Sequence, residues 1–172
     1  TNLAQAAPVL LSKTHLATTS GRVRAVITNS GCANACTGPQ GMTDAQEMAA
    51  LTAAALGCSA DDVLVASTGV IGVNLKMPAL RNGIPRAAAA LSPEGGADAA
   101  IAIMTTDPFP KSAAVEVVTP SGTFRVGGMT KGSGMIEPRM ATMLGYLTTD
   151  AKVDPTVLAG ALKHVVDLTF NA

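Results

Sequence analysis

Aromatic side chains are almost missing from this 172-residue sequence, which has no Trp, one Tyr and three Phe. Charged residues are also scarce at 14%, against about 25% in typical soluble domains, and Lys plus Arg equals Asp plus Glu at 12 each. Nucleic-acid binding needs phosphate-neutralising charge and often stacking rings. We therefore expect no nucleic-acid partner, and we expect other polypeptide to cover part of the surface.

Long apolar runs and paired cysteines are missing as well. The longest runs, such as 53–56 and 63–66, are far shorter than the roughly 20 residues of a membrane span, so we expect no membrane partner. The cysteines, Cys32, Cys36 and Cys58, are an odd number without dense spacing, which argues against a secreted disulfide scaffold. A structural zinc site wants four ligands, so we expect no metal here.

Histidine is too rare to supply an obvious catalytic base. His15 and His164 fall in predicted helical or terminal segments, where a surface or packing role is expected. Standard motifs fail too, because Lys131 is followed by Gly132 and not by the Ser or Thr of a P-loop, and no GxSxG elbow occurs. A nucleophile in this chain would need a base other than histidine.

Short β-like runs alternate with helix-like runs, which indicates an α/β or α+β fold. Gly57 is expected to end one helix, and Asp154 with Pro155 to start another. A capping box is expected at 43–46, after a loop over 29–42. No linker or repeat appears, so residues 1–172 are expected to form a single domain segment. The predicted strands are 22–28, 62–67, 112–118 and 123–126, and the last two are expected to form a hairpin through a turn at 120–122. The predicted helices are 43–56, 77–91, 97–104 and one that starts at 154.

The stretch 127–150 carries the chemistry, because a glycine-rich turn leads into a predicted buried strand with Thr142 near its beginning. A cut before Thr142 would free an α-amino group, which titrates near 7.7–8.0 in model peptides, roughly the physiological range. That amine can take the proton from the threonine hydroxyl. Thr142 would first attack the Ala141 carbonyl, shift the acyl group from N to O, and lose it to water.

Five segments resemble the ornithine acetyltransferase family, also called the bifunctional glutamate N-acetyltransferases. The segment KGSGMIEPRMATML at 131–144 resembles the family's self-cleavage motif. The other four agree in order and spacing, which makes the resemblance specific. They are NSGCANACTG at 29–38, ASTGVIG at 66–72, AIMTTD at 102–107 and LTTDA at 147–151.

The resemblance implies roles for individual residues. It implies self-cleavage between Ala141 and Thr142, with Thr142 as the catalytic nucleophile and a substrate contact. It implies an oxyanion hole at Thr68 and Gly69, and substrate binding by Thr105 and Lys131.

Each of these roles has a structural alternative. Thr68 and Gly69 also suit a plain strand-to-helix turn, Lys131 a solvated loop, and Thr105 a helix end. The segment 29–38 would line the pocket, support the oxyanion turn, or be purely structural. Thr106 and Asp107 receive no role.

The family fold is a layered α-β-β-α sandwich, and its reaction moves an acetyl group from N-acetylornithine to glutamate in arginine biosynthesis. No cofactor is implied, although some members accept acetyl-CoA as donor. The chain is expected to be an incomplete piece whose cleaved halves assemble as two α and two β chains. The expected compartment is the cytoplasm, or the mitochondrial matrix in a fungus.

Three alternatives stay open. One is a self-processing aminopeptidase or amidase of the same fold, with water as the final acceptor. Another is an acetyltransferase serving a specialised-metabolite pathway. The third is a non-catalytic binding or structural domain.

Overall fold

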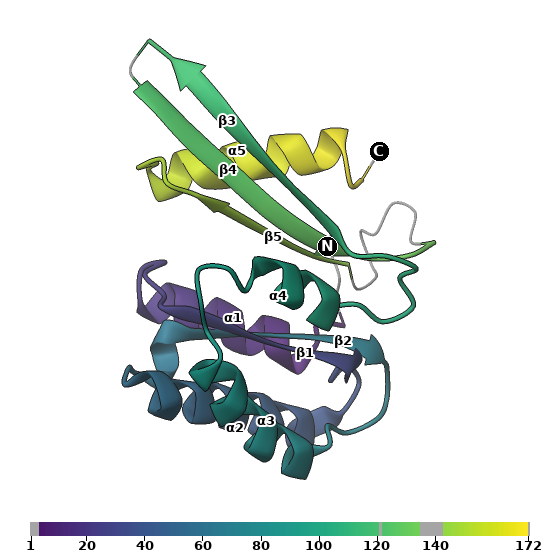
Figure 1. The fold of residues 1–172 in the computed structure, drawn as a ribbon. Helices are drawn as coiled ribbons and strands as arrows, with labels where there is room; N and C mark the ends of the chain where they lie inside the picture. The colour runs from purple at the N-terminus through teal and green to yellow at the C-terminus, as the bar shows by residue number, and fades with distance from the viewer. Residues whose placement is uncertain (1–3, 121, 135–142, 172) are drawn as a thin grey trace. The chain divides into compact units, whose positions relative to one another are not determined.

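The computed structural model describes residues 4–120, 122–134 and 143–171, and the chain forms two compact units (Figure 1). The N-terminal unit is Asn2–Gly96 and the C-terminal unit is Ala97–Ala172. No helix within these ranges is long and apolar enough to cross a membrane.

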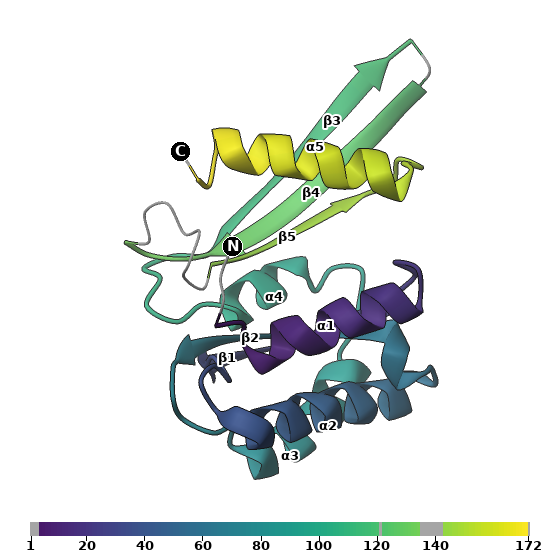
Figure 2. The same cartoon turned by 180° about the vertical axis from the view of Figure 1, so that it is seen from behind.

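The N-terminal unit is built on two parallel strands, β1 (Ala25–Cys32) and β2 (Val63–Val70). Helix α1 (Ala7–Thr18) packs on β2, and α2 (Gly38–Leu56) runs beside α3 (Met77–Ala89) (Figures 1 and 2). Alternation of strand and helix along the chain gives the parallel pairing its crossover connection. The core is made of small and medium apolar side chains, namely Leu11, Ala45, Met48, Ala49, Ala53, Val63, Val65, Leu75, Met77 and Ile84.

Helix α2 ends where the sequence predicts but begins earlier than predicted. Gly57 follows its last residue and adopts the left-handed conformation, with a φ of +67°, so the predicted helix end is confirmed. The capping box predicted at 43–46 is wrong, because α2 already begins at Gly38 with Pro39 in its first turn. Proline suits the first turn of a helix, where its missing N–H costs no hydrogen bond.

The predicted loop over 29–42 is wrong in part, because β1 continues through Cys32. Asn29, Ser30 and Gly31 pair in register with Ser67, Thr68 and Gly69 of β2. Asn, Ser and Gly have low strand propensity, but pairing with a neighbouring strand overrides such preferences.

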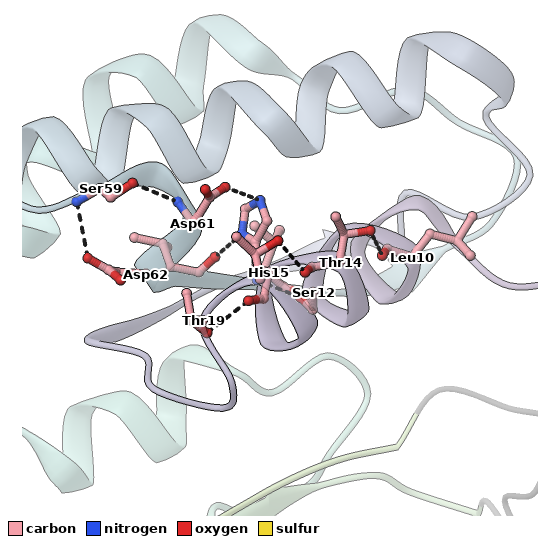
Figure 3. A network of polar contacts seen from close by, with 11 residues as sticks. Leu10, Ser12, Thr14, His15, Thr19, Ser59, Asp61 and Asp62 are labelled. Atoms are coloured by element: carbon pink, nitrogen blue, oxygen red, sulfur yellow. Dashed lines mark hydrogen bonds and ion pairs between the residues drawn. The ribbon is translucent and has the colours of Figure 1, made fainter.

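His15 connects α1 to the first residue of β2 within a network of polar contacts (Figure 3). The His15 side chain is buried, with Nδ1 2.8 Å from the carbonyl oxygen of Val63 and Nε2 3.6 Å from Asp61 Oδ1. One turn earlier, the Ser12 hydroxyl lies 2.9 Å from both the carbonyl oxygen and the amide nitrogen of Val65. The packing role expected for His15 is therefore confirmed.

The C-terminal unit contains an antiparallel sheet in the order β3-β4-β5. Its strands are β3 (Lys111–Thr119), β4 (Gly122–Lys131) and β5 (Leu144–Thr149), so the predicted hairpin is confirmed. Helix α4 (Gly96–Ala102) precedes the sheet, and α5 (Pro155–Leu168) follows it.

Helix α5 begins as expected, because Asp154 Oδ1 accepts a hydrogen bond from the Thr156 amide at 2.8 Å. The helix lies across the sheet (Figure 2). Side chains of β3, β4, β5 and α5 line a groove of about 550 Å³. The strand predicted after Met140 is confirmed as β5, but its predicted burial is wrong, since Leu147 remains 57% exposed. One helix covers only part of a three-stranded sheet.

We predict that the N-terminal core is sensitive to loss of volume. Met48 is 0% exposed, and Met48→Ala should lower the free energy of unfolding by about 2–5 kcal/mol. Leu91→Ala, at a position 71% exposed in the same unit, should change it by less than about 0.5 kcal/mol. Urea unfolding of both variants checks this, and equal losses would contradict the assigned core.

Candidate functional site

The predicted oxyanion pair, Thr68 and Gly69, lies near the end of β2. The strand was expected to stop at Ser67, but it continues to Val70. Gly69 has a φ of +130°, and a Cβ built on it would lie 2.6 Å from both the Gly31 carbonyl oxygen and the Cys32 nitrogen. Glycine is therefore required here, because β1 and β2 approach main chain to main chain.

The segment after β1 is hydrogen-bonded through its backbone to the end of β2 and to the loop that follows. The Ala33 amide donates to the Val70 carbonyl at 2.9 Å, and the Gly72 amide donates to the Ala35 carbonyl at 2.9 Å. Both bonds reach the chain just after Thr68 and Gly69, at Val70 and Gly72. They fix residues 33–35 beside the end of β2, and the part that 29–38 plays in the site stays a prediction.

A buried asparagine fixes the same segment to α2. Asn34 has a φ of +49° and no exposed surface. Its Nδ2 donates to the Gly41 carbonyl at 2.8 Å, and its Oδ1 accepts from the Thr37 hydroxyl at 2.7 Å. The segment is therefore fixed to α2 as well as to the end of β2.

Thr105 and Lys131, the predicted substrate residues, lie together in the C-terminal unit. Lys131 ends β4, and its Nζ donates to Thr105 Oγ1 at 2.7 Å. The lysine is only 5% exposed, so the solvated-loop reading is wrong for it. Burial of a charged side chain away from the core is a common sign of function, and the substrate role itself stays a prediction.

Asp107 is the residue that the sequence reasoning missed. Its side chain is 0% exposed, and Oδ1 accepts from Lys111 Nζ at 2.7 Å and from the Gly132 amide at 2.6 Å. Oδ2 lies 3.3 Å from the Thr105 amide nitrogen. A signal was present, because an acidic residue in an otherwise uncharged segment, two positions after a candidate contact, needs partners if it is buried. We call Thr105, Asp107, Lys111, Lys131 and Gly132 the Asp107 cluster.

The protonation state of Asp107 follows from these contacts. Burial alone would raise the pKa of the carboxyl group, since it disfavours the charged form. The Lys111 ammonium and the amides of Gly132 and Thr105 outweigh burial, and they hold the pKa of Asp107 well below its usual range. The cluster therefore contains a carboxylate, and not a carboxylic acid, at neutral pH.

The pairing of β4 with β5 places one cluster residue, Lys131, opposite a residue that lies close to the predicted nucleophile in the sequence. Lys131 pairs with Leu144, which follows Thr142 by two positions. Met143 Cγ lies 3.5 Å from the point where a Cβ on Gly132 would stand. Ala141 and Thr142 themselves lie outside the described residues.

The predicted site residues are thus divided between the two units. Thr68 and Gly69 belong to the N-terminal unit, whereas Thr105 and Lys131 belong to the C-terminal unit. Within 4–120, 122–134 and 143–171, no group of three or more His, Cys, Asp or Glu side chains is arranged to hold a metal ion.

Comparison with known proteins gives one consistent result. A model of the ArgJ family matches residues 1–172. The arginine biosynthesis bifunctional protein ArgJ of Symbiobacterium thermophilum is 58% identical over 171 residues, covering 99% of this chain and 42% of that protein. Its counterpart in Chlorobaculum tepidum is 50% identical over 172 residues, covering 100% and 43%. The chain therefore spans less than half the length of these curated relatives.

Solved structures agree. An ornithine acetyltransferase complexed with ornithine, from Mycobacterium tuberculosis, matches with a TM-score of 0.71 at 43% identity, covering 83% of this chain and 74% of that one. An ArgJ structure from Bacillus halodurans matches with a TM-score of 0.71 at 39% identity, covering 83% and 73%. The expected α/β fold of this family is confirmed.

We predict that Gly69 tolerates no side chain. Gly69→Ala and Gly72→Ala both place alanine at positive φ, which costs about 1–3 kcal/mol. Only at Gly69 would the Cβ also overlap neighbouring main chain, which should add about 1–3 kcal/mol. Urea unfolding of the two variants measures the difference, and equal destabilisation would rule out the close approach.

We predict a specific acid dependence for Asp107. Its folded-state pKa is depressed, so its stabilisation is present above the unfolded value of about 3.9 and declines as pH falls below that value. Asp107→Asn should therefore lower stability most at neutral pH, by about 1–3 kcal/mol, and less at pH 3. Thermal unfolding of both proteins from pH 7 to pH 3 checks the sign, and a deficit that grows towards acid pH would contradict it.

Proposed function

This chain belongs to the ArgJ family, and from that premise we propose that the protein transfers an acetyl group from N-acetylornithine to glutamate through an ester on Thr142. The observation that carries the proposal is the buried contact between Lys131 and Thr105. It supplies positive charge and a hydroxyl beside β5, the strand that begins two positions after Thr142. The likeness to an ornithine acetyltransferase whose structure holds ornithine supports an amino-acid substrate.

The first step of the proposed mechanism is self-cleavage. The Thr142 hydroxyl attacks the Ala141 carbonyl, the peptide C–N bond breaks, and the acyl group moves from nitrogen to oxygen. Water then hydrolyses the ester and leaves Ala141 with a carboxylate and Thr142 with a free amine. That amine has an ordinary pKa of about 7.7–8.0, which suits a general base near neutral pH.

The second step is acetyl transfer. The free amine takes the hydroxyl proton, Thr142 Oγ1 attacks the acetyl carbon, and ornithine leaves with a proton. The amine of glutamate then attacks the acetyl ester, which yields N-acetylglutamate and restores the threonine hydroxyl. In this mechanism Thr68 and Gly69 donate hydrogen bonds to the oxyanion, and each such donor is worth about 2.7–4 kcal/mol of barrier.

The remaining features of the proposal follow the same family. Lys131 and Thr105 bind the polar end of the amino-acid substrate, and no metal or redox cofactor takes part. Cleaved halves assemble as two α and two β chains in the cytoplasm, in arginine biosynthesis. Acetyl-CoA is a candidate second donor, which an assay without N-acetylornithine distinguishes.

We predict that Thr142 is needed for both cleavage and transfer. In the full-length protein, Thr142→Ala should remain one polypeptide on a denaturing gel and form no N-acetylglutamate, because it lacks the attacking hydroxyl. Thr142→Ser keeps a hydroxyl and should retain measurable cleavage. Intact mass after purification identifies the cut, and an uncleaved parent protein with full transferase activity would rule out the mechanism.

A product assay separates acetyl transfer from hydrolysis. Incubation of the cleaved protein with N-acetylornithine and glutamate should give ornithine and N-acetylglutamate in equal amounts. Without glutamate, release of acetate should be slow, because water is excluded from the ester. Rapid acetate release that is independent of glutamate would instead identify an amidase.

A further inference from the structure

We propose that Asp107 is a positioning residue that holds Thr105 and Lys131 in the geometry that binds substrate. This inference rests on the proposed function, because it concerns the same site. Asp107 acts through the main chain at two points, the amide of Thr105 and the amide of Gly132. Neither the family resemblance nor the sequence motifs gave it a role.

The carboxylate draws together parts of the chain that are distant in sequence. Gly132 follows Asp107 by 25 positions, and its amide lies 2.6 Å from Oδ1. Thr105 precedes Asp107 by two positions, and its amide lies 3.3 Å from Oδ2. A buried carboxylate is stable only while such donors surround it, so the loop before β3 and the end of β4 are held in one arrangement.

Asp107 fixes a main-chain position at or next to each predicted substrate residue. It accepts a hydrogen bond from the amide of Thr105 itself, and from the amide of Gly132, which directly follows Lys131 in the chain. The 2.7 Å contact between Lys131 Nζ and Thr105 Oγ1 therefore depends on main-chain positions that Asp107 sets. A shift of these positions would misalign the lysine and the hydroxyl that bind substrate, and hydrogen bonds weaken steeply as their geometry departs from the ideal.

A carboxylate suits these donors and an amide does not. Among the described residues, the hydrogen-bond partners of Asp107 are all N–H donors, namely Lys111 Nζ and the amides of Gly132 and Thr105. An ionised carboxylate accepts at both oxygens, whereas an asparagine amide presents a donor at one of the two positions. If asparagine keeps the oxygen near Gly132 and Lys111, its NH₂ group faces the Thr105 amide.

The chain offers a matched control at Asp150. Its Oδ1 also accepts a main-chain amide hydrogen bond, from Arg125 at 2.7 Å, but on the exposed surface of the same unit. Asp150→Asn makes the same chemical change outside the Asp107 cluster.

The first experiment measures steady-state kinetics of the cleaved full-length protein with N-acetylornithine and glutamate. Asp107→Asn should lower kcat/KM by about 10- to 100-fold, mainly through a higher KM for N-acetylornithine, whereas Asp150→Asn should stay within about twofold. An unchanged kcat/KM in Asp107→Asn would overturn the proposal. A loss confined to kcat would overturn it as well, because binding geometry would then be intact.

The second experiment tests whether Asp107 acts through Thr105. In a Thr105→Ala background the hydroxyl contact to Lys131 is already gone, so adding Asp107→Asn should cost far less than it does alone. If the fold-losses in kcat/KM of the two single variants multiply fully in the double variant, Asp107 has a structural role elsewhere and the proposal is overturned.

Hydrogen exchange separates failure of this inference from failure of the proposed function. The amides of Thr105 and Gly132 should exchange faster in Asp107→Asn than in the parent protein, while the amides at the far end of β3, residues 116–119, should not change. If the parent protein transfers no acetyl group, the proposed function fails, and exchange alone then judges whether Asp107 holds the two segments. Unchanged exchange at both amides would overturn the inference whatever the activity.

Discussion

The candidate site depends on one electrostatic constraint, which is that the buried carboxylate of Asp107 must be surrounded by N–H donors. An unpaired buried charge costs several kcal/mol, so the three donors cannot leave independently. They come from positions 105, 111 and 132, which are the loop after α4, the first residue of β3 and the residue after β4. These three points therefore form one arrangement, and the lysine and hydroxyl predicted to bind substrate are part of it.

The N-terminal unit meets a different constraint, which is close approach of main chain to main chain. At the end of the β1–β2 pair no room exists for a Cβ on Gly69. The core beneath is likewise made of short side chains such as Ala45, Ala49 and Ala53. The scarcity of aromatic residues thus has a physical meaning, since helices and strands covered by small side chains approach closely without large rings.

Signals that act within a few residues were sufficient for part of the fold. Gly57, Asp154 and the hairpin turn were predicted correctly, because a left-handed glycine, a side-chain cap and a turn depend on their immediate neighbours. The strand through Asn29–Cys32 was missed, because its stability comes from pairing with β2, some 38 positions away in the register. Asp107 was missed in part for the same reason, as one of its partners, the Gly132 amide, lies 25 positions away. Resemblance supplied Thr105 and Lys131, which residue type alone would not have selected.

His15 and Asp107, two of the buried ionisable residues, show why residue type is a poor guide to function. His15 Nδ1 faces the Val63 carbonyl, an acceptor, so the ring donates there and fastens α1 to β2, while Nε2 lies 3.6 Å from Asp61 Oδ1. In the part of the chain that the structure describes, Asp107 accepts hydrogen bonds from N–H donors, so it stays ionised and orders main chain next to a buried lysine. A histidine, the residue most often suspected of catalysis, is structural here because its partner is a strand backbone. An aspartate to which the family resemblance gave no role gains importance because two of its partners are Thr105, which is predicted to bind substrate, and Gly132, the direct neighbour of Lys131.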